Sequence, residues 1–392
     1  MAGGQPRVAV VGAGIGGCTL AVALYAAGIH CTVYEQAPAL KPVGAGIQLA
    51  PNAVRPLRRL GLGEHLRAVA VDVTAIHMRR WSDGATISRL PLAGCVEMFG
   101  APYYTVLRAD LHDGLVGLLP AGSLRLGRRV VAVHDAADRS ELEFADGGRE
   151  AADVIVGADG IHSVVRAGLH RDQPRFSGQL IFRGLVPAER VPFLTDDPRV
   201  QLWLGPDQHC VSYPVASGRL VSFGATVAAA EGRAESWSAE ADPGEVALAY
   251  RDWHPQVREL IAAADAVGRW ALHDRDTVTG WSGRRTVLLG DAAHPMLPFL
   301  AQGANQAIED AVTLARCLAD ADPDDVRPAL RRYEAVRRPR TDEVHLRSRA
   351  NNRTLHLRDG ALAHERDERL SRTVDLRDQE WLYGYDCAGA VA

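Results

Sequence analysis

The sequence predicts an α/β fold with three parts: a core domain that is discontinuous in the sequence, an inserted antiparallel β-sheet, and a helical C-terminus. Two observations support the core domain. An apolar strand at residues 7–11 runs directly into a glycine-rich turn, and two later strand–turn–helix segments, at 153–166 and 285–319, repeat this pattern. A third observation supports the insertion, because successive β-segments at residues 178–226 are typical of an antiparallel sheet with one solvated face.

The N-terminal segment has the order of elements that binds a dinucleotide. The strand leads into Gly12-Ala-Gly14-Ile-Gly-Gly17, a helical stretch follows, and a second strand ends on Glu35. Gly12 permits the tight turn, Gly14 lets the backbone approach a pyrophosphate, and Gly17 lets the helix pack on the strand. The helix N-terminus offers N–H groups to phosphate, and Glu35 can accept hydrogen bonds from a ribose diol. The sequence therefore predicts a Rossmann-like domain here.

The same segment has an alternative interpretation as a membrane-spanning helix or a signal peptide, because residues 8–29 contain no charged side chain. Four glycines within residues 12–17 suit a turn better than a spanning helix. The second strand, which ends on an acid, continues a βαβ pattern rather than a leader peptide. We therefore expect no membrane segment.

Composition excludes few functions. The formal net charge of the 392 residues is −4 at pH 7, which gives no overall attraction to nucleic acid or to an anionic membrane. The six cysteines contain no C-x-x-C pair and no metal-ligand spacing, so we expect no metal site. Reduced cysteines are the default in a chain of this kind, and we expect a cytoplasmic protein.

The remaining elements follow in order along the chain. A helix is expected from residue 51 to Gly61, a β-hairpin around Ser82-Asp83-Gly84, and a helix from Arg108 to residue 119. Strands are expected at 124–133, 141–145, 180–187, 199–204, 209–215, 219–227 and 269–274, with helices at 244–251 and 255–264. We assign residues 1–75, 98–177 and 268–325 to the core domain, 76–97 and 178–267 to the inserted domain, and 326–392 to the C-terminal helical segment.

Two further motifs, taken with the glycine turn, resemble a known family. Gly157-Ala-Asp159-Gly160 follows one buried strand, and Gly290-Asp291-Ala-Ala-His-Pro follows another. In this order, and over nearly the whole chain, they resemble the class A flavoprotein monooxygenases, the aromatic-hydroxylase family. The resemblance implies FAD in the N-terminal fold and NADH or NADPH as a transient electron donor. No second dinucleotide fold is visible in the sequence, which agrees with a transient nicotinamide.

The resemblance also assigns cofactor contacts to individual residues. Glu35 would hold the adenosine ribose, Arg108 would contact FAD, and Asp291 would bind its ribityl-phosphate region. Asp159 belongs to a segment that the family uses for FAD and for the reduced nicotinamide. Further cofactor contacts are expected at Gln48, Gly290, Pro298 and Gly303.

The segment 291–310 has a physical argument of its own. A strand delivers Asp291, a proline-rich turn follows, and Ala301-Gln302-Gly303 opens a helix. A helix N-terminus directed at the isoalloxazine would stabilise the negative charge that a reduced flavin carries near N1. Small residues at this point would let the flavin ring approach the backbone.

The inserted sheet is predicted to bind the substrate. His209 and Tyr213 are four residues apart on an expected strand, so they share one face, while Cys210 faces the other side and is expected to be inert. The pair resembles the His and Tyr of the 3-hydroxybenzoate 6-hydroxylase and 6-hydroxynicotinate 3-monooxygenase branches. There the histidine is assigned as the base that activates a ring hydroxyl, which suits an imidazole of pKa ~6.5. A purely structural histidine is the alternative.

Three further residues are candidates for substrate contacts. Gln302 resembles the glutamine that helps to position substrate in the 3-hydroxybenzoate branch, with an ordinary residue at a helix start as the alternative. Gln48 stands where the hydroxynicotinate enzymes have a histidine, which counts against that substrate. Arg183, on an inserted strand, is a candidate partner for a substrate carboxylate.

The C-terminal part is expected to be structural. The arginine-rich stretch 327–358 has interleaved acids and few aromatic residues, which favours a solvated or dimer-facing helix over a nucleic-acid site. The tail from Trp381 to Asp386 resembles the tail of the same hydroxylase branch and is expected to pack over the core.

Together these features predict a single-component, FAD- and NAD(P)H-dependent monooxygenase that hydroxylates a small phenolic or hydroxylated heteroaromatic compound, in particular a carboxylic acid such as a hydroxybenzoate. By resemblance, the oxygen comes from O2 through a flavin C4a-hydroperoxide, with or without decarboxylation of the substrate. One alternative is an FAD-dependent epoxidase or a monooxygenase of natural-product scaffolds, which needs no phenol base. Another is a flavin-binding regulatory protein without turnover. The expected partners are the aromatic substrate and O2, with a homodimer as one option for assembly.

Overall fold

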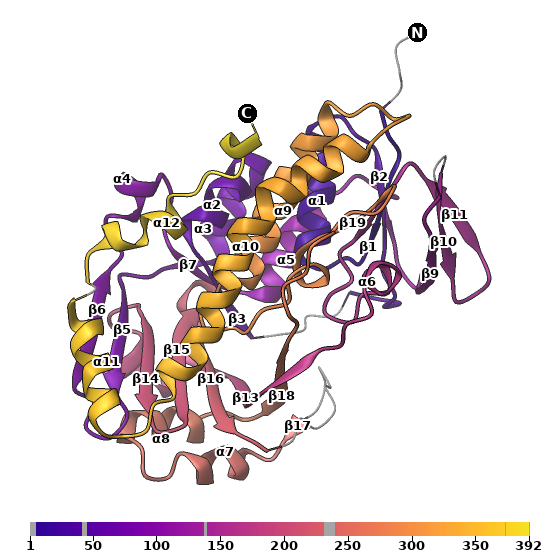
Figure 1. Cartoon of the computed structure of the whole chain (residues 1–392). Helices are drawn as coiled ribbons and strands as arrows, with labels where there is room; N and C mark the ends of the chain where they lie inside the picture. Colours follow the sequence, from indigo (N-terminus) through magenta and orange to yellow (C-terminus); the bar gives the residue numbers. More distant parts are fainter. Residues whose placement is uncertain (1–4, 41–44, 137–138, 231–239, 373, 392) are drawn as a thin grey trace.

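The computed structural model describes residues 5–40, 45–136, 139–230, 240–372 and 374–391. Within these residues the chain forms sheets of five, eight, three and three strands. Figure 1 shows the five-stranded sheet and its helices at one end of the molecule and the eight-stranded sheet at the other. The long helix α10 (Arg327–Leu355) runs past both.

The five-stranded sheet brings the ends of three motif-bearing strands together. Its order is β19–β12–β1–β2–β8, and all its pairings are parallel. The strands are β1 (Val8–Val11), β2 (Cys31–Tyr34), β8 (Leu124–Arg125), β12 (Val154–Gly157) and β19 (Thr286–Leu288). Val11 pairs with Gly157, which pairs with Leu288, so the three turns that follow these strands lie side by side. Doubly wound sheets bind their ligands at this carboxyl edge.

Helices and two small sheets lie around this sheet and between it and the eight-stranded sheet. The helices are α1 (Ile15–Ala26), α2 (Pro51–Leu57), η1 (Arg58–Leu62), α3 (Gly63–Val69), α4 (Cys95–Phe99), α5 (Arg108–Gly117), α6 (Val164–Leu169), η5 (Gly290–Ala292) and α9 (Gly303–Ala319). One small sheet contains β3 (Gly46–Leu49), β7 (Tyr104–Leu107) and β4 (Val71–Asp72), and the other contains β11 (Arg149–Ala152), β10 (Ser140–Phe144) and β9 (Val130–His134). Helix α1 packs on α9, which places the first and last motifs together.

One expected element in this half differs from the structure, and another ends at the expected residue. The strand expected at 124–133 is two strands, β8 and β9, in different sheets, because the chain turns at Gly127 with a positive φ of 68°. The helix expected from residue 51 to Gly61 is α2 followed by η1, and its backbone breaks at Gly61, as expected. Gly61 itself has a φ of 97° within η1, and α3 continues the chain in a new direction.

The eight-stranded sheet has the order β17–β18–β13–β16–β15–β14–β5–β6. Its strands are β5 (Ala75–Arg80), β6 (Thr86–Pro91), β13 (Arg175–Pro187), β14 (Val200–Gly205), β15 (Gln208–Val215), β16 (Leu220–Ala228), β17 (Glu240–Ala241) and β18 (Val267–Asp274), with the short turns η2 (Ala188–Arg190), η3 (Pro192–Leu194) and η4 (Ala216–Gly218). The hairpin β5–β6 joins through a parallel pairing of β5 with β14. Because β18 pairs with β13, the domain boundary is better placed after Asp274 than at the predicted residue 268.

The two faces of the eight-stranded sheet have different neighbours. Helices α7 (Pro243–Ala249) and α8 (Pro255–Ala262) cover the outer face, where Cys210 is buried with Tyr250 and Trp203. Side chains alternate along β15, so His209 and Tyr213 point to the opposite face. Cys210 therefore faces away from the candidate site, as expected.

The C-terminal segment returns to both sheets. Helix α11 (Ala361–Arg372) packs on β6, and the tail continues through η6 (Leu376–Gln379), α12 (Glu380–Tyr383) and η7 (Gly389–Val391). The guanidinium of Arg55 donates to the carbonyl oxygens of Tyr383 at 2.9 Å and Tyr385 at 2.5 Å. The tail therefore packs over the core, as predicted.

The uncharged stretch 8–29 forms β1, α1 and the turn before β2, as the βαβ interpretation predicted. Across the described residues, no helix combines the length and the apolar composition that crossing a bilayer requires.

Candidate active site

Of the three fingerprint glycines Gly12, Gly14 and Gly17 after β1, two are closed to larger residues and one is open. Gly12 has a positive φ of 100°, and a Cβ there would lie 2.5 Å from the carbonyl oxygen of Ala158. A Cβ on Gly17 would overlap the carbonyl oxygen of Gly12. A Cβ on Gly14 would meet no atom within 4 Å, so the space in front of this turn is available to a ligand.

Glu35 is held in place by the backbone. Its Oε2 accepts a hydrogen bond from the Ala13 amide at 3.0 Å, and its Oε1 accepts one from the Ala37 amide at 2.8 Å. Each carboxylate oxygen keeps a free lone pair for a further donor. This arrangement fits a pair of ribose hydroxyls beside the glycine turn.

Asp159 lies at the next turn and has an unused acceptor. Its Oδ2 accepts from the Val164 amide at 2.7 Å, whereas its buried Oδ1 has no partner among the described residues. Burial raises the pKa of Asp159. A Cβ on Gly12 would come within 3.0 Å of the Asp159 Cα, so this acceptor belongs to the same edge of the sheet.

Arg108 and Asp291 are charged groups without direct partners. Within the described residues neither side chain has a hydrogen bond or an ion pair, but each acts electrostatically on the pKa of the other. Burial lowers the pKa of Arg108, which Asp291 and Glu35 oppose. Burial raises the pKa of Asp291, which His294 and Arg108 oppose. The structure therefore brings Glu35, Arg108 and Asp291 together beside the open glycine turn.

The segment after β19 is fixed by Asp310 of α9. Asp310 Oδ2 accepts from the Gly290 amide at 3.0 Å and contacts His294 Nε2 at 2.6 Å. A Cβ on Gly303, the first residue of α9, would lie 4.0 Å from Asp291 Oδ1, so the helix N-terminus is beside this acid. The carbonyl of Pro298 accepts from the Ala301 amide at 2.9 Å and closes the turn between them.

Tyr213 connects the inserted sheet to β3. Its hydroxyl donates to the Gly46 carbonyl at 2.7 Å, and the side chains of Gln48 and Ser222 are close enough to affect its pKa, which burial raises. Gln48 Oε1 accepts from the Tyr103 hydroxyl at 2.7 Å. Gln48 thus lies next to Tyr213, where β3 meets the inserted sheet.

Arg183 lies on β13 of the inserted sheet. No hydrogen bond or ion pair involves its guanidinium within the part of the chain that the structure describes, and its one ring contact is with Trp270, at 5.9 Å from the ring centroid. Burial lowers the pKa of Arg183, and nearby Arg108 acts in the same direction. Tyr213 is also an electrostatic neighbour of Arg183. A half-buried, unpaired arginine is unfavourable unless an anion binds beside it.

His209 lies deeper on the same sheet face. It is 4% exposed, and its ring makes an edge contact with Phe299, whose centroid is 5.5 Å away. Its Nδ1 lies 2.7 Å from Nε2 of His356, and no partner of its Nε2 is found among the described residues. Burial and the neighbouring His356 hold the pKa of His209 well below 6.5.

Gln302 is buried immediately before α9. Its Oε1 accepts from Nδ2 of Asn52 at 3.1 Å and from Nε2 of Gln306 at 3.2 Å. Its own Nε2 has no partner within the described segments of the chain. The Oε1 acceptor of Gln302 is therefore used by other side chains of the protein, while its Nε2 donor is available to a ligand.

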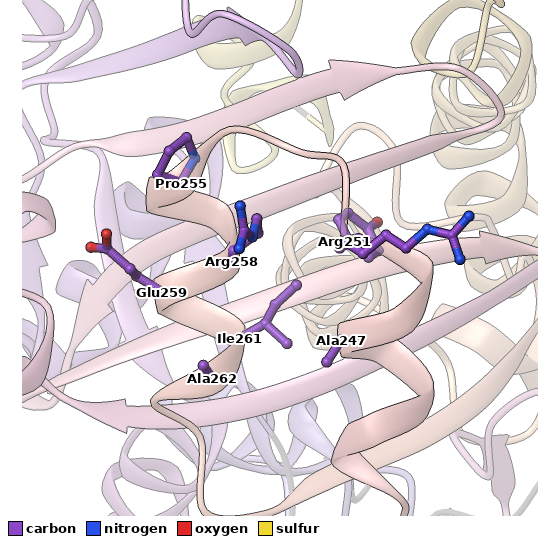
Figure 2. A pocket seen from close by; sticks show the side chains of 8 residues that line it. Ala247, Arg251, Pro255, Arg258, Glu259, Ile261 and Ala262 are labelled. Carbon is purple, nitrogen blue, oxygen red and sulfur yellow. The ribbon is translucent and has the colours of Figure 1, made fainter.

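A surface hollow of about 440 Å³ lies elsewhere, between α7 and α8. Figure 2 shows it on the two helices that cover the outer face of the eight-stranded sheet. It is lined by Ala247, Tyr250, Arg251, Pro255, Arg258, Glu259, Ile261 and Ala262. None of the predicted site residues lines this hollow, and the sheet separates it from the side chain of His209.

Comparison with known proteins identifies the family. A family model described as FAD binding domain matches residues 5–348. The chain belongs to this FAD-binding family. It is 51% identical to the 3-amino-4-hydroxybenzoate 2-monooxygenase PtmB3 of Streptomyces platensis, over 98% of this chain and 97% of the relative. It is 37% identical to a 6-hydroxynicotinate 3-monooxygenase of Bordetella bronchiseptica, over 98% and 96%.

A solved structure agrees with this assignment. The chain is similar to Klebsiella pneumoniae HpxO complexed with FAD and uric acid, with a TM-score of 0.85 and 29% identity, over 98% of this chain and 96% of that one. The prediction of an FAD-dependent aromatic monooxygenase is confirmed. In a member of the FAD-binding family, the open space at Gly14, the free lone pairs of Glu35 and the unpaired Arg108 and Asp291 fit FAD.

Sequence reasoning missed two residues of this FAD-binding protein. Asn305 accepts from the Ala50 amide at 2.8 Å and donates to the Gln48 carbonyl at 3.0 Å, which fixes β3 against the start of α9. Its place in the first turn of α9, close to Gln302, was an available signal. His356 gave no such signal, because it is 147 residues from His209 in the sequence.

Proposed function

We propose that this enzyme hydroxylates a benzoate with amino and hydroxyl groups on neighbouring carbons, of the 3-amino-4-hydroxybenzoate type. The support is the 51% identity with the relative named for this substrate, against 37% with the hydroxynicotinate enzyme. FAD, reduced by NADH or NADPH, would supply an electrophilic oxygen atom derived from O2. The substitution of Gln48 for the histidine of hydroxynicotinate enzymes supports the same choice.

The observation that carries this proposal is the unpaired Arg183. Its guanidinium lies in a half-buried place next to Tyr213, without a carboxylate in the described part of the protein to neutralise it. A planar guanidinium binds a carboxylate with two parallel hydrogen bonds. We assign Arg183 to the substrate carboxylate, and Tyr213, which is fixed on the Gly46 carbonyl, to the wall beside it.

We assign His209 to the proton of a ring donor group. For hydroxylation at carbon 2, electrons must come from the amino group on carbon 3, because the hydroxyl on carbon 4 is meta to carbon 2. An acceptor that takes a hydrogen bond or a proton from such a donor makes the ring more nucleophilic. Because its pKa lies well below 6.5, His209 is neutral at pH 7 and can accept.

The same assignment gives the remaining residues their tasks. Glu35 would hold the ribose of FAD, Gly14 would allow the pyrophosphate to approach, and Arg108 and Asp291 would bind the phosphate and sugar-alcohol part. Asp159, Gly290, Pro298 and Gly303 would line the cofactor. The free Nε2 donor of Gln302 would face the reacting groups at the N-terminus of α9.

Compartment and assembly are separate parts of the proposal. We infer a cytoplasmic enzyme, because all six cysteines are buried and free and no disulfide joins any of them. A homodimer is the assembly to test by light scattering.

The test is NADH and NADPH oxidation by the purified enzyme, with peroxide assayed in parallel. The panel contains 3-amino-4-hydroxybenzoate, 4-hydroxybenzoate, 3-hydroxybenzoate, 6-hydroxynicotinate and the uncharged 2-aminophenol. We expect strong stimulation with little peroxide for the aminohydroxybenzoate, and weak stimulation for 2-aminophenol because Arg183 has no carboxylate to bind. Coupled hydroxylation of 6-hydroxynicotinate in preference to 3-amino-4-hydroxybenzoate would overturn the proposal. Equal rates of coupled hydroxylation with 2-aminophenol and 3-amino-4-hydroxybenzoate would contradict the assignment of Arg183 to the substrate carboxylate.

A further inference from the structure

The ring of His209 has a second histidine as its nearest polar neighbour. Nδ1 of His209 lies 2.7 Å from Nε2 of His356, and the two rings are nearly parallel, with centroids 5.0 Å apart and an interplanar angle of 24°. His356 follows the last residue of α10, and Phe299 contacts both rings edge-on. Both histidines are buried, His209 at 4% exposed and His356 at 8%.

The other side of His356 determines where the hydrogen atoms lie. Its Nδ1 is 3.1 Å from Oδ1 of Asn352, one turn earlier on α10. An amide oxygen can only accept, so Nδ1 of His356 carries a hydrogen and its Nε2 has the lone pair. His209 therefore donates from Nδ1 to His356, and the Nε2 atom of His209 is left unprotonated.

Thr226 is the competing partner on β16. Its Oγ1 lies 3.2 Å from Nδ1 of His209 and 3.2 Å from Nε2 of His356, and it also contacts the backbone of His209. At 3.2 Å it is a weaker acceptor for the Nδ1 hydrogen than His356 at 2.7 Å. Tyr250 approaches from the outer face and donates to the carbonyls of His209 and Thr226, so it does not compete for the ring.

The charged groups around His356 come from two neighbouring segments. Asp207, in the turn between β14 and β15, donates its amide to the His356 carbonyl, and its carboxylate is paired with Arg358. On α11, Arg366 donates to the Thr354 carbonyl and is paired with Asp367. Burial lowers the pKa of His356 to about 4, and Asp207 acts against this shift. Asp207 therefore offsets part of the cost of a proton on His356.

We propose that His356 is a positioning residue for the base: it accepts the Nδ1 hydrogen of His209 and so keeps Nε2 of His209 free to take a proton from the ring donor of the substrate. This rests on the proposed function. When the donor's N–H or O–H bond breaks, a bond forms to Nε2 of His209. The Nδ1 hydrogen of His209 then passes to Nε2 of His356. The positive charge therefore resides on His356, one ring farther from the substrate, and the proton returns by the reverse transfers.

The test reads the imidazole hydrogens directly. Two-bond ¹H–¹⁵N spectra of the holoenzyme labelled in histidine distinguish the Nδ1–H from the Nε2–H form, and the His209→Gln variant identifies the signal of His209. We expect the Nδ1–H form in the wild type and a change towards Nε2–H in His356→Phe. His356→Gln, which keeps an acceptor oxygen near the place of Nε2, is expected to restore Nδ1–H. Thr226→Val is the matched control and should leave the form unchanged.

Activity provides a second readout. We expect kcat to fall about tenfold in His356→Phe with KM nearly unchanged, and to recover in His356→Gln. An Nε2–H form in the wild type, or an unchanged form in His356→Phe and His356→Gln, would overturn the inference. So would a change in Thr226→Val alone, because Thr226 would then be the acceptor. Because the spectra need no turnover, an enzyme that has the expected form but rejects every aromatic acid would contradict the proposed function and leave this inference intact.

Discussion

Arg337 of α10 donates from Nε to Oδ1 of Asp310 at 2.7 Å, while the other oxygen of Asp310 holds the Gly290 amide. Arg337 also donates to Oε2 of Glu309 at 2.6 Å, and all three side chains are fully buried. Burial alone would raise the pKa of Asp310, but His294 and Arg337 lower it to about 2. A helix at the end of the chain thus fixes the segment that carries Asp291.

Replacement of Arg337 should be strongly destabilising. In Arg337→Met, two buried carboxylates each lose one of their two charged partners, since Arg340 stays with Glu309 and His294 stays with Asp310, and breaking such a buried network costs roughly 3–5 kcal/mol. The measurement is urea unfolding at pH 7, and FAD affinity is expected to fall as well because the Asp310 carboxylate that holds the Gly290 amide is less firmly fixed. Arg331→Met, an exposed position on the same helix, is the control and should change the stability by less than about 0.5 kcal/mol. Similar stability of the two variants would contradict this role.

Two glycines of the turn after β1 should respond differently to alanine. Gly17→Ala places a Cβ against the Gly12 carbonyl and should lower the melting temperature by several degrees. Gly14→Ala meets no protein atom, so the apoprotein should melt as the wild type does, while FAD affinity falls at least about tenfold. Fluorescence titration with FAD measures the second effect. Wild-type affinity in Gly14→Ala would mean that the cofactor does not approach this turn.

Arg183 should determine the affinity for acidic substrates. Loss of a charge-assisted pair costs about 1.5–3 kcal/mol, so Arg183→Gln should raise the Kd of an aminohydroxybenzoate roughly 10- to 100-fold. The flavin absorption change on titration measures this Kd. Arg251→Gln, an exposed arginine at the hollow between α7 and α8, is the control. A larger effect at Arg251 than at Arg183 would move the binding site to that hollow.

His356 should make the enzyme less stable in mild acid. Its pKa is about 4 in the folded protein and ~6.5 in the unfolded chain, so only the unfolded chain is protonated between these values. The contribution of neutral His356 to the free energy of unfolding is complete above pH 6.5 and is lost as the pH falls to 4. This makes the protein about 2 kcal/mol less stable at pH 5 than at pH 7.

Urea unfolding at pH 7 and at pH 5 tests this. For each variant, the quantity compared is the difference between its unfolding free energies at the two pH values. His356→Gln should reduce that difference by most of this amount. His364→Gln removes an exposed histidine of α11 and should leave the difference unchanged. If both variants behave like the wild type, His356 does not titrate as described.

The local parts of the fold could be predicted from the sequence. The path from β1 through Gly12, Gly14 and Gly17 to Glu35 is encoded by neighbouring residues, and the same holds for the turns at Asp159 and Asp291. The alternation of side chains on β15 also placed His209 and Tyr213 on one face. In each case the determining interaction lies within one supersecondary unit.

Contacts between distant segments could not be predicted in this way. The parallel pairing of β5 with β14 depends on how the hairpin docks, which no local pattern encodes. The division of 124–133 into β8 and β9 follows from a turn at Gly127 that apolar periodicity did not reveal. The contact between His209 and His356 depends on where a 29-residue helix ends. A single sequence carries no signal for such tertiary choices.

Helix α10 also has a mechanical consequence. At 1.5 Å per residue, its 29 residues form a rod about 43 Å long. Arg337, on this rod, is anchored in the parallel-sheet half through Glu309 and Asp310, while His356, at its end, is joined to β15 of the eight-stranded sheet. A large hinge rotation between the two halves would have to bend this rod or break one anchor. We therefore expect the two halves to stay in register when substrate binds, so binding kinetics should respond more to replacements in the segment 294–302 than to domain motion.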